Sequence, residues 1–171
     1  MAYLSSESFV KGTAPKKSGN NHPILALYGL FNSSDGEVAV APASDKFCNI
    51  FLECIELTNL LNHEIYKDNE NRMKNRQSLN DIINDKMKQK TSDYWIEKLN
   101  YAGCPAAKVA TLPEALNSQL IKDTEMVISS SGPEGRKIKM TGFPVKLSET
   151  PAQLYRSPPL LGEHTEEVLK N

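Results

Sequence analysis

The spacing of hydrophobic and polar residues changes along the chain and divides it into segments. Residues 1–22 carry no sustained hydrophobic period and contain scattered Gly, Pro, Ser and Asn residues, so an extended arm or linker is expected there. Two apolar runs then flank the polar stretch Asn32–Gly36, whose Asp-Gly pair favours the positive φ angles of a hairpin turn. The pattern predicts a β-hairpin with strands at Ile24–Tyr28 and Glu37–Ala41.

A helix is predicted directly after this hairpin. The Ser44 hydroxyl can cap its first turn, and Asp45 follows where the helix dipole favours an anion. Apolar residues then recur at helical spacing, which indicates one buried face. A polar loop is expected at 62–71. The residues of this first helix that are expected to be buried are Phe47, Ile50, Phe51, Cys54 and Ile55.

Two more amphipathic helices follow the polar loop. The later one has a start signal at Thr91 or Ser92 and a stop signal at Gly103, and Pro105 prevents its continuation. Its expected buried face consists of Trp95, Leu99 and Ala102, and that of the earlier helix consists of Leu79, Ile82, Ile83 and Met87.

The rest of the chain predicts short elements and then an extended tail. We expect a strand at Ala106–Ala110, a helix at Leu112–Leu120 and a hairpin with strands Glu125–Ser129 and Arg136–Met140. Residues 141–161 hold four prolines in non-periodic sequence, which is typical of an extended strap, before a short helix at Gly162–Leu169. The expected α/β organisation is an extended arm or linker at 1–22, a small α/β domain at 23–128, and a C-terminal strap with a short helix at 129–171.

Composition narrows the classes of function. The 20 Lys+Arg and 21 Asp+Glu residues give a net charge of −1, which argues against nucleic acid or an anionic membrane as the partner. No apolar run reaches the roughly 18 residues that a membrane-spanning helix needs. The first residues include Glu7 and have no apolar segment of the kind that a secretory signal contains. A cytoplasmic protein is therefore expected.

The residues that most often carry chemistry form no familiar motif. Three cysteines lack Cys-x-x-Cys spacing, and three distant histidines lack a His-Glu-x-x-His pair, so neither a disulfide framework nor a metal site is expected. The loop Ser131–Gly135 lacks the Gly-Lys-Ser/Thr of a phosphate-binding loop and is better explained as a hairpin turn. Glu163 and His164 could act as an acid and a base, although a capping role fits their place at a helix start better.

Six short motifs follow one another between Gly19 and the end of the chain. They are Gly19-x-x-His22-Pro23 with Tyr28 and Phe31; Asp35–Val40; Arg72-x-x-Asn75-Arg76-x-x-Leu79; Trp95-x-x-x-Leu99-x-x-x-Gly103-x-Pro105-x-x-x-Val109; Phe143–Pro151; and Pro159–Leu169. In this order they resemble the C-terminal half of the family III CoA-transferases, a family that includes formyl-CoA:oxalate and carnitine CoA-transferases and α-methylacyl-CoA racemase. The closing Leu-Gly-Glu-His-Thr element is the most specific of the six.

The resemblance implies an enzyme whose chain is normally much longer. A Rossmann-like large domain would come first, followed by a small α/β domain and a strap that returns to the large domain, and two such chains would interlock as a homodimer. An Asp carboxylate of the large domain would attack an acyl-CoA and carry CoA as a thioester while CoA passes between carboxylic acids. That aspartate and most of the CoA pocket would lie outside this chain, so no catalytic residue and no bound cofactor are assigned within it.

The resemblance also points to candidates on the substrate side. Racemases of this family tend to carry a catalytic Glu after the strand that corresponds to Val38–Val40, because moving an α-proton requires a base and an acid. This chain has Ser44 at the aligned position and Asp45 beside it, which favours a transferase. A racemase-like enzyme remains an alternative, as does a non-catalytic remnant or dimerisation module. The chain is expected to be a truncated or split part of the enzyme and to be inactive alone.

Overall fold

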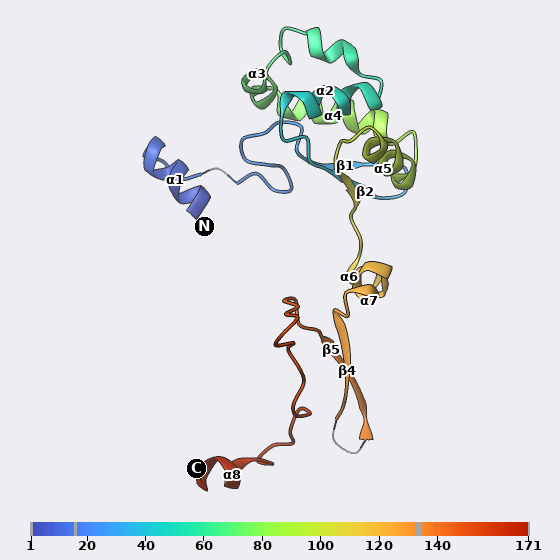
Figure 1. The fold of residues 1–171 in the computed structure, drawn as a ribbon. Coiled ribbons are helices and arrows are strands. Elements are labelled where there is room, and N and C mark those ends of the chain that lie inside the picture. The colour runs from blue at the N-terminus through green and yellow to red at the C-terminus, as the bar shows by residue number, and fades with distance from the viewer. Residues whose placement is uncertain (1, 16, 133–134, 171) are drawn as a thin grey trace. The chain divides into compact units, whose positions relative to one another are not determined.

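The computed structural model describes residues 2–15, 17–132 and 135–170. The fold is α/β, and it separates into two compact units, Met1–Val109 and Ala110–Asn171 (Figure 1). The domain boundary expected at 128/129 lies inside the second of these units. The division into domains by function therefore stays a prediction.

The first unit contains a three-stranded antiparallel sheet in the order β1-β2-β3. Phe31, Val38 and Val40 point from this sheet into the core and are at most 1% exposed, so the alternation of apolar residues sets which face is buried. The strands are β1 at Gly29–Asn32, β2 at Glu37–Val40 and β3 at Ala106–Lys108.

The predicted hairpin is present, but its first strand was placed too early. The expected strand at Ile24–Tyr28 is largely a turn, and β1 begins at Gly29. The amides of Ile24 and Leu25 donate to the ring nitrogen Nδ1 of His22, so they are used within the turn and not in a strand ladder. Apolar residues in a short run can be buried by a turn as well as by a strand, which the pattern alone does not distinguish.

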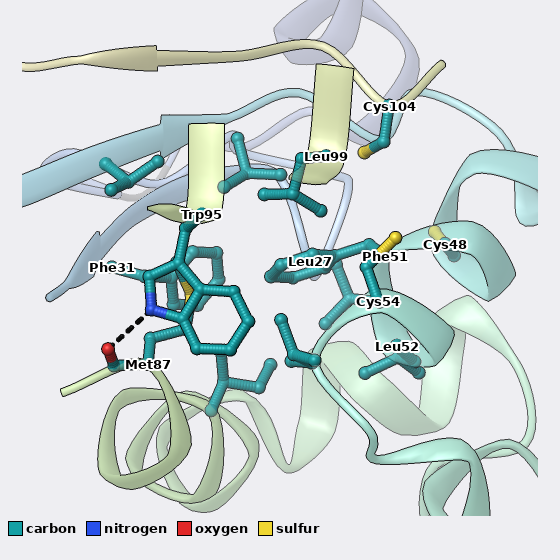
Figure 2. Close-up of a cluster of buried hydrophobic side chains, with 14 of the residues drawn as sticks. Leu27, Phe31, Cys48, Phe51, Leu52, Cys54, Met87, Trp95, Leu99 and Cys104 are labelled. Carbon is teal, nitrogen blue, oxygen red and sulfur yellow. Dashed lines mark hydrogen bonds between the residues drawn. The ribbon is translucent and has the colours of Figure 1, made fainter. Parts of the chain in front are cut away.

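Helices pack against the sheet in the first unit. Helix α4 contacts β1, and α5 contacts β2 and β3. The Trp95 indole lies in the resulting core and donates its Nε1 proton to the Met87 carbonyl at 2.6 Å (Figure 2). The helices are α2 at Asp45–Cys54, the 3₁₀ helix η1 at Thr58–Asn62, α3 at Asn69–Lys74, α4 at Arg76–Met87 and α5 at Ser92–Tyr101.

Most of the predicted buried faces are confirmed, with some exceptions. Helix α2 buries Cys48 and Leu52, whereas Phe47 and Ile50 are only half-buried. Two further residues were wrongly predicted to be buried: Ile82 of α4 is 37% exposed, and Ala102, which directly follows α5, is also exposed. The expected polar loop at 62–71 includes the start of α3, which Asp68 caps by accepting from the Asn71 amide at 2.8 Å. The residues that were predicted to be buried and are buried in the structure are Phe51, Cys54, Ile55, Leu79, Ile83, Met87, Trp95 and Leu99.

The N-terminal segment also differs from its prediction. Helix α1 occupies Ala2–Lys11, so residues 1–22 are not an extended arm throughout. Lys11 Nζ lies 2.7 Å from Glu7 Oε1 one helical turn away, a spacing that stabilises a helix. Phe9 and Val10 are more than four-fifths exposed, so this helix lacks the buried apolar face by which the sequence pattern indicates a helix.

The second unit consists of short elements. The single helix expected at Leu112–Leu120 is divided in two by Ser118, whose backbone is extended and whose side chain caps the second helix. The second hairpin is present, with Ile128 opposite Met140, although residues 133–134 of its turn lie outside the described residues. The elements are α6 at Leu112–Asn117, α7 at Gln119–Asp123, β4 at Val127–Ser131, β5 at Lys137–Thr141 and α8 at Thr165–Lys170.

The two units differ in how much apolar surface they bury. Among the residues whose burial the structure describes, every hydrophobic member of the buried core lies between Ala26 and Cys104. Among the described residues from 110 onward, no apolar side chain is buried, and Leu161 is completely exposed. Residues 142–164 form neither helix nor strand, as expected for a strap. In the part of the chain that the structure describes, no helix has the length and apolar character that crossing a membrane requires.

Candidate functional site

Ser44 and Asp45 lie where β2 leads into helix α2. Ser44 has the extended backbone of an N-cap residue, but its side chain makes no capping hydrogen bond. The Asp45 side chain is 85% exposed, and its Oδ1 lies 3.5 Å from Arg72 Nη1. The two candidates predicted from the sequence are therefore neighbours on the surface, and the buried cation Arg72 lies next to Asp45.

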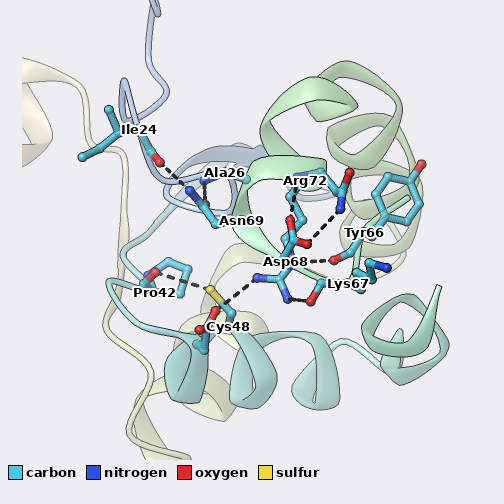
Figure 3. Close-up of polar contacts among 11 residues, drawn as sticks. Ile24, Ala26, Pro42, Cys48, Tyr66, Lys67, Asp68, Asn69 and Arg72 are labelled. Carbon is cyan, nitrogen blue, oxygen red and sulfur yellow. Dashed lines mark hydrogen bonds and ion pairs between the residues drawn. The ribbon is translucent and has the colours of Figure 1, made fainter. Parts of the chain in front are cut away.

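Arg72 is the buried cation at this site. Its side chain is 4% exposed, and its Nε donates to the Tyr66 carbonyl at 2.7 Å while Nη2 donates to the Lys67 carbonyl at 3.4 Å (Figure 3). Burying a guanidinium is costly unless its N–H groups find acceptors, and here backbone carbonyls supply them. The side chain thus holds the 66–67 loop beside the start of α2. The sequence marked Arg72 as part of a motif but gave it no role.

Cys48 lies one turn into α2, behind Asp45. Its Sγ is 3.7 Å from the Pro42 carbonyl, to which it can donate a weak hydrogen bond. Burial raises the pKa of the Cys48 thiol, and the nearby Arg72 charge only partly opposes this change. A thiol with a raised pKa stays protonated at neutral pH, so Cys48 is a poor nucleophile.

Asn69 joins this site to the chain that precedes β1. Its Oδ1 accepts from the Ala26 amide at 3.1 Å, and its Nδ2 donates to the Ile24 carbonyl at 2.8 Å. Asn69 and Arg72 are one helical turn apart on α3. One short helix therefore contacts both the 24–26 turn and the surface at Asp45.

The Glu163 and His164 pair lies in the second unit and serves the local chain. Glu163 Oε2 accepts from the Leu160 amide at 2.6 Å, which closes the turn before α8. His164 Nδ1 is 3.7 Å from Glu167 Oε2. Arg156 binds the Glu167 carboxylate through two nitrogens, and this interaction lowers the pKa of Glu167. This geometry fits the capping role.

The described residues include an apolar groove but no cluster of side chains that is suited to a metal ion. Among them, no three His, Cys, Asp or Glu side chains are grouped so as to hold a metal ion. An open groove of about 540 Å³ lies in the second unit between α6 and the β4–β5 hairpin. Its walls are largely apolar and include Leu112, Leu116, Val127 and Met140.

Comparison with known proteins decides the family. The model of CoA-transferase family III matches residues 1–165. The chain belongs to this family. The expected family resemblance is therefore confirmed, and it extends further toward the N-terminus than the motifs from Gly19 onward.

Relatives and solved structures of family III agree with this assignment. The chain is 31% identical over 159 residues to succinyl-CoA:mesaconate CoA-transferase of Haloarcula hispanica, covering 92% of this chain and 39% of that protein. It is 22% identical over 170 residues to succinyl-CoA:glutarate CoA-transferase of Homo sapiens, covering 99% of this chain and 39% of that protein. A CAIB/BAIF family protein from Brucella suis has a similar structure, with a TM-score of 0.77 and 25% identity over 99% of this chain and 43% of that one.

These family III relatives are longer than this chain. It spans about two fifths of the length of the proteins it matches, from 39% to 43% in the three comparisons above. Ser44, Asp45 and Arg72 lie within residues 1–165, which match the family model. The structure brings Arg72 to Asp45, the neighbour of Ser44 in sequence, while Glu163 and His164 belong to the other unit.

Proposed function

We propose that this family III chain is the C-terminal part of a CoA-transferase that moves CoA between carboxylic acids. The observation that carries the proposal is the family match over residues 1–165. The names of the relatives agree, because each describes transfer from an acyl-CoA to an acid. No cofactor is required in this scheme, since the CoA thioester is itself the substrate.

The proposed reaction proceeds through an aspartyl-CoA thioester formed outside this chain. An Asp carboxylate attacks the acyl-CoA thioester and displaces the CoA thiolate, which leaves a mixed anhydride. The thiolate then attacks the aspartyl carbonyl of this anhydride, which releases the donor acid and forms the aspartyl-CoA thioester. The acceptor carboxylate takes CoA by the same two steps in reverse, and the Asp carboxylate is regenerated. Covalent catalysis of this kind divides one difficult exchange into two easier ones. Within this chain, Ser44 and Asp45 are the proposed residues on the acyl side.

The residue at position 44 supports transfer over racemisation. Racemisation needs a base and an acid that exchange a proton with the substrate, and groups suited to this task have a pKa near the working pH. The Ser44 hydroxyl is exposed, and its side chain makes no capping hydrogen bond in the structure. We therefore propose a transferase, with a racemase-like activity as an outcome that the experiment below would detect.

The second unit supports the proposal that the chain works with a large domain. No described apolar side chain from residue 110 onward is buried, and a two-stranded hairpin is at best marginally stable in water. Exposed apolar surface of this kind marks an interaction site. The proposal also keeps the interlocked homodimer implied by the family resemblance and the cytoplasmic location expected from the sequence.

The test is coexpression with the large-domain half of a family III CoA-transferase. We expect the two polypeptides to copurify and to transfer CoA from succinyl-CoA to a dicarboxylic acid, measured as the new acyl-CoA by chromatography. The control is the same large-domain half with its nucleophilic aspartate replaced by alanine, which should abolish transfer and leave copurification intact.

Two other results would replace the proposal. Exchange of the α-proton of a 2-methylacyl-CoA in heavy water, without CoA transfer, would show a racemase-like enzyme. Absence of both a complex and any turnover would show a non-catalytic remnant or dimerisation module.

A further inference from the structure

Residues 21–28 form neither helix nor strand, and side-chain contacts and hydrogen bonds hold their conformation. His22 stacks on Tyr28 with ring centroids 5.0 Å apart, and its own amide donates to the Tyr28 carbonyl at 2.8 Å. Its Nδ1 accepts from the Ile24 amide at 3.3 Å and from the Leu25 amide at 3.2 Å. The His22–Leu25 turn is thus closed by a side chain from within.

Arg76 closes the same turn from outside. Its Nη2 donates to the His22 carbonyl at 2.7 Å and also to the Leu25 carbonyl, so one guanidinium nitrogen bridges the two ends of the turn. Hydrogen bonds from a charged donor are stronger than those between neutral groups. Arg76 is only partly buried, and this burial lowers the pKa of its guanidinium. The side chain remains a cation at neutral pH.

Neighbouring side chains on α3 and α4 hold the residues on either side of this turn. Asn80, four residues after Arg76, donates from Nδ2 to Asn21 Oδ1 at 3.2 Å. Asn69 binds the Ile24 carbonyl and the Ala26 amide, as described above. The turn therefore depends on the side chains of two helices that lie more than forty residues later in the chain.

The same helices hold the surface that carries Ser44 and Asp45. Arg72, one turn before Arg76, reaches the 66–67 loop and faces Asp45 at 3.5 Å. The motifs Gly19-x-x-His22-Pro23 and Arg72-x-x-Asn75-Arg76 are separate in sequence but form one structure here. Arg76 joins them directly.

We propose that Arg76 is a positioning residue of the transferase. It holds the His22–Leu25 turn in one conformation beside helices α3 and α4, which also hold the surface that carries Ser44 and Asp45. This inference rests on the proposed function for its role in the reaction, but not for its structural part. A turn that is already ordered binds a substrate without a further ordering cost, so loss of Arg76 should weaken substrate binding more than it slows the chemical steps.

The structural part is tested by amide hydrogen exchange on the full 171-residue chain. In Arg76→Met, the Ile24, Leu25 and Ala26 amides should exchange about 10- to 100-fold faster, the range expected from the loss of hydrogen bonds to a charged group. Amides in α5 should keep their wild-type rates. Lys74→Met is the matched control, because Lys74 is a cation on the adjoining helix whose side chain is 65% exposed and should leave the turn unchanged.

Two results would overturn the inference. One is an Arg76→Met chain in which the three amides exchange at the wild-type rate. The other concerns the case in which Arg76→Met unfolds and all of its amides exchange rapidly. Arg76→Lys, which retains the charge but loses the planar donor geometry, is then the variant to measure. The inference requires exchange at 24–26 to rise in Arg76→Lys, and a wild-type rate there would refute it.

The reaction is tested separately in the coexpressed enzyme. Arg76→Met should raise KM for the acid severalfold and change kcat less, and Arg76→Lys should recover part of this loss. A fall in kcat alone would contradict the positioning role. If the wild-type complex shows no transfer, the proposed function fails, while the exchange experiment still decides whether Arg76 holds the turn.

Discussion

Arg72 fixes a loop through backbone carbonyls, and its ion pair contributes little. Its carboxylate partner, Asp45, is 85% exposed at 3.5 Å, and exposed ion pairs are worth at most about 1 kcal/mol. The 2.7 Å hydrogen bond from Nε to the Tyr66 carbonyl is shorter and lies in a buried place. The stabilising effect of Arg72 should therefore come from the loop it holds.

Replacing Arg72 by methionine should lower the free energy of unfolding by about 2–4 kcal/mol, because it leaves the Tyr66 and Lys67 carbonyls without a charged donor. Urea denaturation followed by the fluorescence of Trp95 measures this change. Lys74→Met should shift the free energy by no more than about 0.5 kcal/mol. An Arg72→Met chain as stable as this control would show that the loop does not depend on the guanidinium.

Asp35 connects the first hairpin to helix α5. Its Oδ1 accepts from the Ser92 amide at 2.7 Å and from the Ser33 hydroxyl at 2.9 Å. These hydrogen bonds, the first from Ser92, lower the pKa of Asp35 below its ordinary value of 3.8. The Asp-Gly pair was predicted to supply positive φ angles, but Asp35 has none and acts through its carboxylate.

The ionised form of Asp35 should stabilise the fold above pH 3.8, and this contribution should disappear as the pH falls through the lowered pKa of the folded state. Asp35→Asn should therefore be less stable than the wild type near neutral pH, and the difference should shrink in acid. Urea midpoints across this range measure it. Glu97→Gln, which removes an exposed carboxylate of α5, is the control for the loss of one negative charge. A constant Asp35→Asn difference at all pH values would refute the assignment.

Thr91 and Ser44 were both predicted to cap a helix, but only one of them does so with its side chain. Thr91 Oγ1 accepts from the Tyr94 amide at 3.3 Å and caps α5, whereas Ser44 makes no side-chain capping bond at α2. At the end of α5, Gly103 has a φ of 84°, a left-handed conformation that glycine adopts readily. Both ends of α5 therefore match the prediction. Helix α2 also begins directly after Ser44 as predicted, but without the side-chain hydrogen bond of a cap.

Thr91→Ala should lower the free energy of unfolding by about 1 kcal/mol, the usual cost of losing a capping side chain. Ser44→Ala should change it by less than about 0.5 kcal/mol. Thermal or urea unfolding of both variants makes the comparison. If Ser44→Ala proved equally destabilising, Ser44 would be a structural cap, and any loss of transfer in that variant could not be attributed to the substrate side.

The elements that the sequence predicted correctly are those whose start, buried face and end are all marked by residues within the element itself. Helix α5 has a cap, a buried stripe and a stop within one short segment, and the hairpin has a polar turn between apolar runs. The misses involve partners far along the chain. The apolar run 24–28 resembles a strand in sequence, but side chains of Asn69 and Arg76 form hydrogen bonds with its backbone groups in the structure. The role of Arg72 likewise follows from the 66–67 loop folding back on it, which periodicity does not encode.

At the scale of the whole molecule, the two units differ in their means of stability. The first has a continuous core from Leu27 to Cys104, whereas the described apolar residues of the second remain at least partly exposed. Hydrophobic burial is the main favourable contribution to folding. The second unit should therefore depend on another surface for its stability.

A fragment of residues 1–109 should unfold cooperatively in urea with a midpoint close to that of the full chain. A fragment of residues 110–171 should show no cooperative transition, or should associate as its concentration rises. Circular dichroism and sedimentation measure both. A cooperative, concentration-independent transition in the 110–171 fragment would contradict this expectation.

The three cysteines offer a way to measure the opening of the first unit in solution. All of them are buried in the first unit, and burial raises the pKa of Cys104 to about 11. A protonated, enclosed thiol reacts with alkylating reagents only when the surrounding structure opens. The rate at which these thiols are labelled therefore measures how often the first unit opens, whatever the second unit is bound to.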